Sequence, residues 1–428
     1  MEVITIERLQ EKLYKEELAG GLTVFVLPKP GFSKTYATFT TDFGSIDNHF
    51  RLAGGKDIRV PDGIAHFLEH KMFEEPEGDI FATFASHGAS ANAFTGFERT
   101  TYLFSATDLV YENLKTLVDF VQHPYFTDQN VEKEKGIIGQ EIKMYEDNPD
   151  WRSYFGLIAA MYKEHPVRID IAGTVETIAG IDKETLYECY NTFYHPSNMI
   201  LFVVGGVDPE KVFELVRANQ AAKTFKPQGE IERLQPEEPA EVGVKEVVVH
   251  LPVSLPKMYF GFKEPSGVPK GEALVRRELA VKLMLDALIG PSTPLYQTLY
   301  DEHLISDSFG HEYNIAPDYA FSVIGGDTPD PERLLARFRE LAEPMIAAGI
   351  SAADFERTRR KRIGSYLRML NSPEAIANEF TRYRFSGGDL FELLPLYDSL
   401  TLAEINGLLR EHFDWRRLAV CTVRSGEA

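Results

Sequence analysis

The sequence predicts an α+β protein built from two similar domains, and three observations support this fold class. With 428 residues, of which 44% are hydrophobic and 26% charged, the chain is long enough for two to three globular domains. Strand-like and helical patterns alternate along the chain, and their order is similar in both halves. A polar stretch at 223–246, rich in Pro and Glu, separates the halves. We therefore expect an internal duplication, with domains at 1–222 and 247–428 joined by a linker at 223–246.

The elements of the two halves can be placed by their patterns. The first half has strand-like runs of apolar and β-branched residues at 22–27, 35–43, 101–106 and 199–205. The second half repeats the mixture, with strands near 246–251 and 258–262 and helical periodicity at 272–288, 331–348 and 352–369. Each half thus offers strands, a long helix, a hairpin-like segment, more helices and a closing strand.

Composition excludes several function classes. The formal charge of −20 makes nucleic acid an unfavourable partner. The longest apolar run, 199–207, is about half the length that a membrane span needs, so no membrane association is expected. The N-terminus is charged and mixed, without the apolar core of a signal peptide. Only two cysteines occur, Cys189 and Cys421, and both are expected to be small buried residues. A reducing compartment, and hence the cytoplasm, is predicted.

The sharpest feature of the sequence is the motif H-x-x-E-H formed by His66, Glu69 and His70. On a helix, positions i, i+3 and i+4 share one face, so the two imidazoles can bind one zinc ion at about 2.0–2.1 Å. Glu69 would lie beside them, where a carboxylate can take a proton from zinc-bound water. The competing interpretation is a pair of core or surface histidines with an unrelated glutamate.

A catalytic zinc needs a third protein ligand, which must come from elsewhere in the chain. The segment 131–146 has the pattern of a charged helix, and Glu134 and Glu141 lie two turns apart on it. We predict Glu141 as the third ligand and Glu134 as the acceptor that orients a histidine ring. The alternative for either glutamate is a solvated helix face.

Several stretches beyond the motif resemble the pitrilysin/insulinase family of zinc metallopeptidases. They include the opening strands around 21–24 and 43–45, the segment 88–95 with Thr101 and Tyr102, and the turn at 194–199. The chain looks like a half-size bacterial member, similar to the catalytic subunit of the mitochondrial processing peptidase. The resemblance covers most of 1–215 and, more faintly, the second half.

The resemblance implies a fold and a way of holding substrate. Each domain would carry a largely antiparallel sheet packed against helices, and the two domains would form half of a clam-like chamber. The second domain would be free of metal, because its comparable helix at 280–288 has no ligands. Peptide substrate would add a strand to an exposed sheet edge. That edge would be formed by five consecutive residues, with the third contacting the substrate backbone: Ser90, Ala91, Asn92, Ala93 and Phe94.

The sequence departs from the family pattern in its second half. Family members usually carry an Arg there, with a Tyr seven residues later that stabilises the oxyanion. Here Tyr300 and Asp307 stand at those positions. Arg359 and Tyr366 have the right separation but are interpreted as surface residues of a basic helix. Losing one oxyanion donor typically lowers the rate by about 10²–10³. A paralogous partner could supply the pair, which makes a heterodimer the favoured assembly and a homodimer the alternative.

Three functions are compatible with these residues. The leading one is a zinc endopeptidase acting on peptides or small unfolded segments inside a closed chamber. The second is a non-catalytic or weakly active peptide-binding subunit, favoured by the missing Arg and Tyr. The third is a lyase that cleaves ribosylhomocysteine, which shares H-x-x-E-H but uses a cysteine as third ligand. Cys189 lies 119 residues beyond His70, and the chain is far too long for such a lyase.

Overall fold

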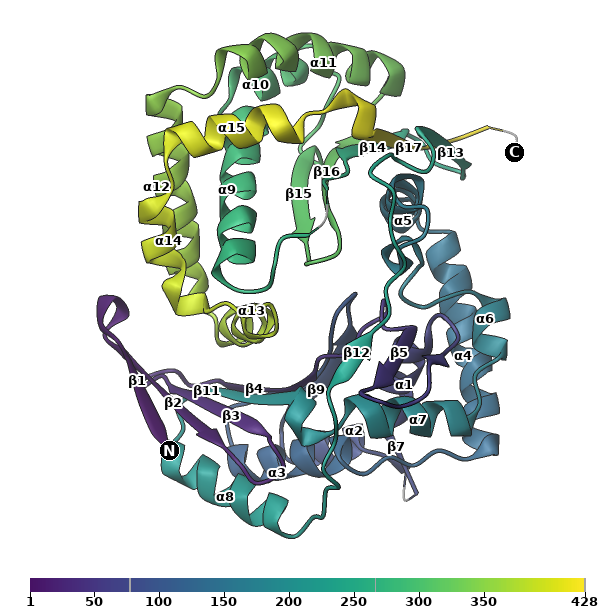
Figure 1. Cartoon of the computed structure of the whole chain (residues 1–428), viewed down its shortest axis with the longest axis vertical. Helices are drawn as coiled ribbons and strands as arrows, with labels where there is room; N and C mark the ends of the chain where they lie inside the picture. Colours follow the sequence, from purple (N-terminus) through teal and green to yellow (C-terminus); the bar gives the residue numbers. More distant parts are fainter. Residues whose placement is uncertain (77, 266, 427–428) are drawn as a thin grey trace. The chain divides into compact units, whose positions relative to one another are not determined.

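The computed structural model describes residues 1–76, 78–265 and 267–426 (Figure 1). By the density of their internal contacts these residues form two compact units, and both units are discontinuous in sequence. The first unit comprises 1–142, 169–234 and 369–385, and the second comprises 143–168, 235–368 and 386–428.

The first unit is built on a seven-stranded sheet. All neighbouring strands are antiparallel except β3 and β11, which run parallel. In spatial order the strands are β1 (Glu2–Ile6), β2 (Glu11–Glu17), β3 (Thr23–Pro28), β11 (Met199–Gly205), β4 (Thr35–Thr41), β10 (Thr100–Ala106) and β9 (Ser90–Thr95). The central strands β4 and β11 are buried along their whole length, which explains their continuous apolar and β-branched character. β9 forms one edge of this sheet.

Helices and two small sheets surround the large sheet. The helices of the first unit are α1 (Ile64–Met72), α2 (Phe81–Ser86), α3 (Val110–Val121), α4 (Asp128–Glu146, whose last turn belongs to the second unit), α6 (Val175–Ala179), α7 (Lys183–Phe193), α8 (Pro209–Ala221) and α13 (Pro373–Phe385). In one small sheet β5 (His49–Leu52) lies between β12 (Ile231–Arg233) and β6 (Ile58–Arg59), and in the other β7 (Glu74–Glu75) pairs with β8 (Gly78–Asp79).

The second unit repeats the topology on a five-stranded sheet. The order is β13 (Glu246–His250), β17 (Leu418–Arg424), β14 (Lys257–Phe262), β16 (Ala320–Asp327) and β15 (Gly310–Ile315). Among the described strands, its single parallel pair is β13 with β17, which corresponds to β3 with β11 in the first unit. Its helices are α5 (Pro149–Met161), α9 (Glu272–Ile289), α10 (Pro294–Asp301), α11 (Pro331–Ala348), α12 (Ala352–Met369), α14 (Leu393–Ser399) and α15 (Leu402–His412). Short 3-10 turns lie at Glu7–Leu9, Pro166–Arg168, Pro196–Asn198, Leu390–Glu392 and Trp415–Arg417.

The predicted duplication and α+β class are confirmed by this match of strand order and direction. Strands β3, β11, β4, β10 and β9 correspond to β13, β17, β14, β16 and β15. Along the described chain, two helices separate the second and third of these strands in each half, α1 and α2 in the first and α9 and α10 in the second. Five helices of the described residues then lie between the fourth strand and the closing strand, α3–α7 in the first half and α11–α15 in the second. By this correspondence α1 matches α9, and α4 matches α12.

One helix from each half of the sequence belongs to the unit that is formed mainly by the other half. α5 follows α4 in the first half of the sequence, but it packs against β13, β14 and β17. α13 follows α12 in the second half and packs against β4 and β11, where Phe380 stacks on Phe202 with ring centroids 4.5 Å apart (Figure 1). The predicted domains, 1–222 and 247–428, are contiguous in sequence and do not include this exchange. These domain boundaries remain a prediction.

The predicted linker also contains structure. Its residues Ile231–Arg233 form β12, which pairs with β5. Arg51 Nη2 lies 2.6 Å from the Glu232 carboxylate, and Arg233 Nε donates to Asp47 Oδ1 over 2.6 Å. These pairings anchor the start of the segment to the first unit. In the described residues, no helix combines the length and apolar character required to cross a membrane.

Candidate metal centre and active site

Helix α1 carries the H-x-x-E-H motif, and its first turn depends on a glycine. Gly63 caps the helix with φ of 89°, a conformation that L side chains rarely adopt. A Cβ at this position would lie 2.4 Å from the carbonyl oxygen of Ala172. Phe67 and Leu68 are buried, so the helix is held through the faces flanking the motif. Gly63 therefore allows α1 to begin close to the backbone of Ala172, and this contact helps to fix the position of the helix that carries His66 and His70.

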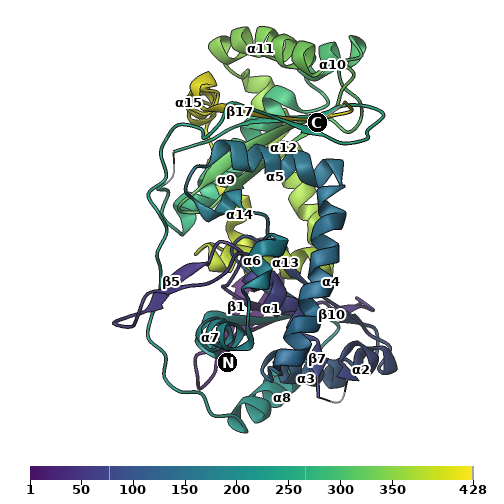
Figure 2. The same cartoon turned by 90° about the vertical axis from the view of Figure 1, so that its right-hand side faces the viewer.

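The long helix α4 supplies the carboxylates that the sequence predicted. It passes close to α1 (Figure 2), and Glu141 faces both histidines. The Glu141 carboxylate lies 3.7 Å from His66 Nε2 and 3.4 Å from His70 Nε2. The imidazole rings have centroids 4.6 Å apart. One ligand atom from each of these three residues lies within 4.8 Å of the others, a spacing compatible with a shared metal ion.

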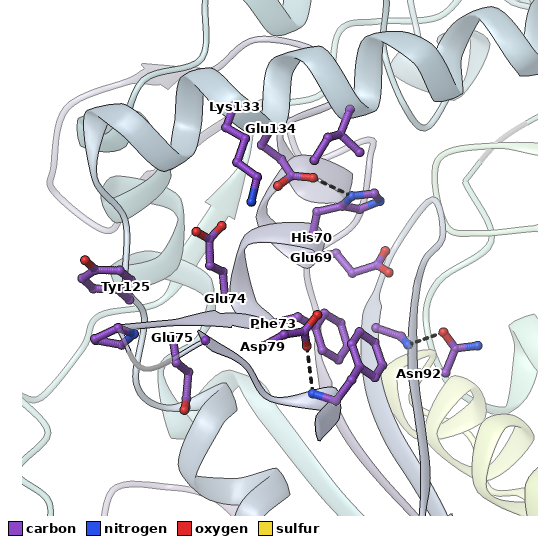
Figure 3. Close-up of a pocket in the computed structure, with 15 residues that line it drawn as sticks. Glu69, His70, Phe73, Glu74, Glu75, Asp79, Asn92, Tyr125, Lys133 and Glu134 are labelled. Carbon is purple, nitrogen blue, oxygen red and sulfur yellow. Dashed lines mark hydrogen bonds and ion pairs between the residues drawn. The ribbon is translucent and has the colours of Figure 1, made fainter. Parts of the chain in front are cut away.

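Glu134, two turns before Glu141 on α4, contacts the second ring nitrogen of His70. His70 Nδ1 donates to Glu134 Oε1 over 3.0 Å (Figure 3), which leaves Nε2 facing Glu141. The second Glu134 oxygen lies 3.8 Å from the buried ammonium group of Lys71. Burial alone would raise the pKa of Glu134, but the hydrogen bond from His70 and the charges of His70 and Lys71 lower it. Glu134 thus stays ionised and fixes the orientation of the ring.

In the described part of the chain, His66 lacks the hydrogen bond that a buried core histidine usually makes. Its Nδ1 is buried and has no hydrogen-bond partner among the described residues. Burial, reinforced by the nearby charge of His70, lowers the pKa of His66 to about 4. The ring is therefore neutral near pH 7 and presents a lone pair beside Glu141. Two imidazoles and one carboxylate form a donor set that suits zinc and leaves a coordination position open.

Glu69 directly precedes His70 on α1 and is close enough to His70 and Glu141 to be affected by their charges. Its side chain is buried, and burial raises its pKa to about 7, although the hydrogen bond from Thr95 and the charge of His70 oppose this. Thr95 Oγ1 donates to Glu69 Oε2 over 2.6 Å. A carboxylate with a pKa near 7, held by one hydrogen bond, is suited to accept and return a proton.

The predicted substrate edge is an edge strand. Ser90, Ala91, Asn92, Ala93 and Phe94 all belong to β9, which pairs only with β10 among the described strands. The Ala93 N–H donates to Asn92 Oδ1 over 2.9 Å instead of to β10, so it points to the free edge (Figure 3). The structure leaves the predicted contact of these residues with substrate untested.

A cavity of about 780 Å³ opens beside Glu69 and His70 within the first unit (Figure 3). It is bounded by the end of α1, the β7–β8 hairpin, β9 and α4. Phe73 and Phe81 line it with their rings stacked, 4.4 Å between centroids and 6° from parallel. Carboxylates of the hairpin and Lys133 of α4 also line it.

Comparison with known proteins identifies the family. A model of "Insulinase (Peptidase family M16)" matches residues 57–175, and one of the "Peptidase M16 inactive domain" matches 180–362. The uncharacterized zinc protease YmfH of Bacillus subtilis (strain 168) is 51% identical over 423 residues, 98% of each chain. The chain belongs to the M16 peptidase family. The resemblance noted in the sequence is thereby confirmed.

Solved structures of M16 relatives share the fold. A crystal structure from Alicyclobacillus acidocaldarius, described as M16-like, has a TM-score of 0.95 with 42% identity and covers 99% of this chain and 100% of that chain. A protease of Helicobacter pylori has a TM-score of 0.81 with 20% identity over 97% of this chain and 100% of its own, a likeness that extends to the fold alone. Both structures match this M16 chain over nearly its whole length and are themselves covered completely.

In the second unit of this M16 chain, ion pairs join the two helices that correspond to α1 and α4. α9 and α12 match α1 and α4 in the duplicated topology. Asp286 of α9 lies 3.0 Å from Lys361 Nζ and 2.5 Å from Arg362 Nε of α12, and His311 Nε2 lies 3.2 Å away. Burial alone would raise the pKa of Asp286, but the hydrogen bond from His311, the charge of Arg362 and the hydrogen bond from Lys361 hold this pKa well below its usual range. In the parts of the chain described, His66, His70 and Glu141 form the single group with metal-ligand spacing.

The second-half residues considered from the sequence occupy different environments. Tyr300 and Asp307 are both exposed. Arg359 is partly buried, with its guanidinium 5.5 Å from the Phe355 ring centroid. The interpretation of Tyr366 as a surface residue is wrong: it is buried, and its hydroxyl donates to the Leu390 carbonyl over 3.0 Å. The basic residues around it hid this apolar face of α12 in the sequence.

Sequence reasoning missed Thr95 and the residues of the cavity wall. Thr95 directly follows the predicted edge residues, but only the fold brings its hydroxyl to Glu69. Phe73 falls one turn after His70, a spacing that was available as a signal. The acidic run at 74–79 offered another, since carboxylates clustered directly after a metal-binding motif are candidates for contact with a charged substrate.

Proposed function

We propose that this chain is the zinc-binding subunit of an M16 endopeptidase that hydrolyses peptides or small unfolded segments. The observation that carries the proposal is the convergence of His66, His70 and Glu141 from two helices, with Glu69 buried beside them. The zinc protease relative with 51% identity over nearly the whole chain supports the same chemistry.

In this proposal His66, His70 and Glu141 hold the zinc ion. When bound, zinc would act as a Lewis acid that acidifies water and polarises the peptide carbonyl. Glu69 is the proton acceptor and later the donor to the leaving amine. Thr95 keeps the Glu69 carboxylate oriented through its hydroxyl, and Glu134 keeps the His70 ring oriented. The extended backbone of the peptide would pair with the β9 edge. There the Ala93 N–H would exchange its hydrogen bond to Asn92 Oδ1 for one to a substrate carbonyl.

We further propose that a paralogous partner completes the site. The positions predicted for the family's Arg and Tyr hold Tyr300 and Asp307, and both are exposed. A partner that carries the pair would close a chamber with this chain and form a heterodimer. The second candidate, a peptide-binding subunit without catalysis, draws on the same substitutions. A homodimer is the other assembly that the sequence allows.

The cytoplasm is the proposed compartment. Cys189 and Cys421 are both buried and free. Burial raises the pKa of each thiol, Cys421 to about 12, so neither is an activated nucleophile. Buried unpaired thiols fit a reducing environment.

The first experiment is hydrolysis of a mixed peptide library by the zinc-loaded chain, with Glu69→Gln as the matched variant. Cleavage should be abolished by a chelator, and Glu69→Gln should lower the rate by about 10²–10⁴ because a general base is lost. Zinc stoichiometry of the variant should remain one per chain. Cleavage that persists in Glu69→Gln would overturn the assigned role.

Addition of the partner separates the remaining candidates. If the zinc-loaded chain alone is inactive, a paralogue that carries the Arg and Tyr pair should restore Glu69-dependent cleavage. Co-purification of an active homodimer alone would argue against the heterodimer. Zinc binding without cleavage under either condition would favour the peptide-binding subunit.

A further inference from the structure

The cavity beside Glu69 combines an aromatic surface with an acidic rim. Phe73, at the end of α1, is largely buried, whereas the Phe81 ring stacked on it is 39% exposed. Both rings line the space that Glu69 and His70 also line. An apolar segment entering here would therefore contact the aromatic pair next to the proposed proton acceptor.

Three carboxylate residues of the β7–β8 hairpin are among those that line this space: Glu74, Glu75 and Asp79. Figure 3 shows the Glu74 side chain pointing toward Lys133 and that of Glu75, the next residue of the strand, pointing the other way. Glu74 pairs with the buried Lys71, and Asp79 Oδ1 accepts the Phe81 N–H over 2.8 Å. The Glu75 side chain has no hydrogen bond or ion pair within 1–76, 78–265 and 267–426. The side chain of Lys133 enters from α4 and is the single Lys or Arg among the lining residues. The rim therefore carries a net negative charge.

We propose that this cavity is a specificity subsite that receives a lysine or arginine side chain adjacent to the scissile bond. The inference rests on the proposed endopeptidase function and names its substrate class. A long basic side chain has an apolar stem, which would pack on Phe73 and Phe81, and a cationic head, which would reach the hairpin carboxylates. A neutral aliphatic side chain would gain only the first contact, and an acidic one would be repelled.

The place of the cavity relative to β9 supports the assignment. Asn92 and Ala93 line it together with Glu69. Because side chains alternate along a strand, a peptide paired with the β9 edge would direct one side chain toward the cavity while its backbone passes Glu69. The residue selected by the cavity is therefore one that flanks the bond to be cleaved.

The test is peptide binding by the zinc-loaded Glu69→Gln chain, which should hold peptides without cutting them. Fluorescent peptides that differ at a single position would carry Lys, Arg, norleucine or Glu there. Lys and Arg peptides should bind about fivefold or more tightly than the norleucine peptide, as expected for one to two partly solvated charge contacts. The Glu peptide should bind most weakly.

Charge variants should move this preference in opposite directions. In the same background, Glu75→Gln and Asp79→Asn should each reduce the Lys-to-norleucine ratio about threefold. Asp79→Asn retains the oxygen that accepts the Phe81 N–H, so the hairpin should keep its form. Lys133→Gln should raise the ratio. Glu146→Gln, which removes an exposed carboxylate of α4 outside the cavity, should leave it unchanged.

The outcomes distinguish this inference from the proposed function. Equal binding of Lys and norleucine peptides, or no binding of any peptide, would overturn the subsite. Glu69-dependent cleavage without a basic preference would keep the peptidase and reject the subsite. Charge-dependent binding by a wild-type complex that cleaves none of the peptides would keep the subsite and reject the endopeptidase.

Discussion

His66 and His70 lie one turn apart on α1, yet their surroundings shift the pKa values of the two rings in opposite directions. Burial leaves His66 neutral near pH 7, with a pKa lowered to about 4. Burial acts against charge on His70 as well, but the hydrogen bond to Glu134 and the charges of Glu69 and Glu141 raise its pKa. Near pH 7 a metal ion therefore meets a neutral His66 and competes with a proton mainly at His70. Zinc affinity should fall as the pH drops, because protons then compete for His70.

Thr95 offers a test of how Glu69 is tuned. Thr95→Val removes the hydrogen bond to the ionised carboxylate and should lower kcat/KM about tenfold. The hydrogen bond lowers the pKa of Glu69, so its loss should raise that pKa and shift the acidic limb of the pH–rate profile to higher pH. Thr95→Ser, which keeps the hydroxyl, should restore both. An unshifted profile in Thr95→Val would show that the hydroxyl does not tune Glu69.

Glu134 can be tested through metal affinity, independently of activity. Glu134→Gln removes the charge that orients His70, and zinc affinity should fall about 10–100-fold in a competition with a chromogenic chelator. Glu132→Gln on the same helix is the control, because Glu132 is largely exposed and pairs only with Lys135 among the described partners. Equal affinities of the two variants would assign Glu134 no role in the site.

At the scale of elements, the site depends on where α1 begins and on which helix faces it. α1 is short and has no acidic residue in its first turn, and Gly63 takes the capping position without a side-chain hydrogen bond. Its position is therefore set by packing and by the close approach of Gly63 to the Ala172 backbone rather than by a strong local cap. α4 is long enough to contribute both Glu134 and Glu141, two turns apart.

Gly63→Ala should damage both the fold and the metal site. The left-handed backbone alone costs about 1–2 kcal/mol for a side chain, and the Cβ would also meet the Ala172 oxygen at 2.4 Å. We expect a total loss of about 3 kcal/mol in urea unfolding followed by circular dichroism, together with weaker zinc binding. Gly54→Ala is the matched control, because Gly54 also has positive φ but no atom lies within 4 Å of the place that its Cβ would take. Gly54→Ala should cost about 1 kcal/mol and leave zinc affinity unchanged.

At the scale of the whole chain, the duplicated units have diverged in what holds their helices together. The first unit joins α1 and α4 through residues suited to a metal ion. The second joins α9 and α12 through Asp286, Lys361 and Arg362. It also contains a polar network in which His412 bonds Glu264 and Ser322, and Tyr313 and Arg277 complete the carboxylate's contacts. His412, Glu264 and Ser322 are all buried, so we assign this network a structural role.

The buried Glu264 predicts how the second unit responds to acid. Burial alone would raise its pKa, but the hydrogen bond and charge of His412 and the charge of Arg277 lower it from 4.5 to about 2. Because the folded pKa is depressed, the stabilisation is present above pH 4.5 and is lost as the pH falls toward 2, an effect of about 3 kcal/mol. The two tryptophans of the chain, Trp151 and Trp415, both belong to the second unit, so their fluorescence follows its unfolding.

Urea midpoints measured by this fluorescence should therefore fall steeply between pH 4.5 and 2, and Glu264→Gln should flatten that dependence while lowering stability at neutral pH. Glu411→Gln is the control, since Glu411 contacts the same Arg277 from an exposed position. A dependence equally steep in Glu264→Gln would place the acid sensitivity elsewhere.

Local sequence patterns were sufficient for the elements and for the motif-bearing helix. Strands at 22–27, 35–43, 101–106 and 199–205 and helices at 272–288, 331–348 and 352–369 are confirmed with small shifts at their ends. Periodicity reports burial along one element, which is a local property. Periodicity could not predict the exchange of α5 and α13 between the two units, because the pattern within a helix does not indicate on which sheet the helix packs.

Sequence patterns were enough to predict the fold class and the duplication, and to select His66, Glu69 and His70 as the candidate chemical centre, because helical spacing places these three on one face. It also singled out Glu134 and Glu141 as a pair on a second helix. Three contacts could be seen only in the folded chain. Glu141 faces both histidines, and Thr95 reaches Glu69. Phe73, Phe81 and an acidic hairpin line one cavity. Those contacts join residues that lie between 8 positions (Phe73 and Phe81) and 75 positions (His66 and Glu141) apart in the sequence. Such contacts are set by how elements pack rather than by any pattern within one element.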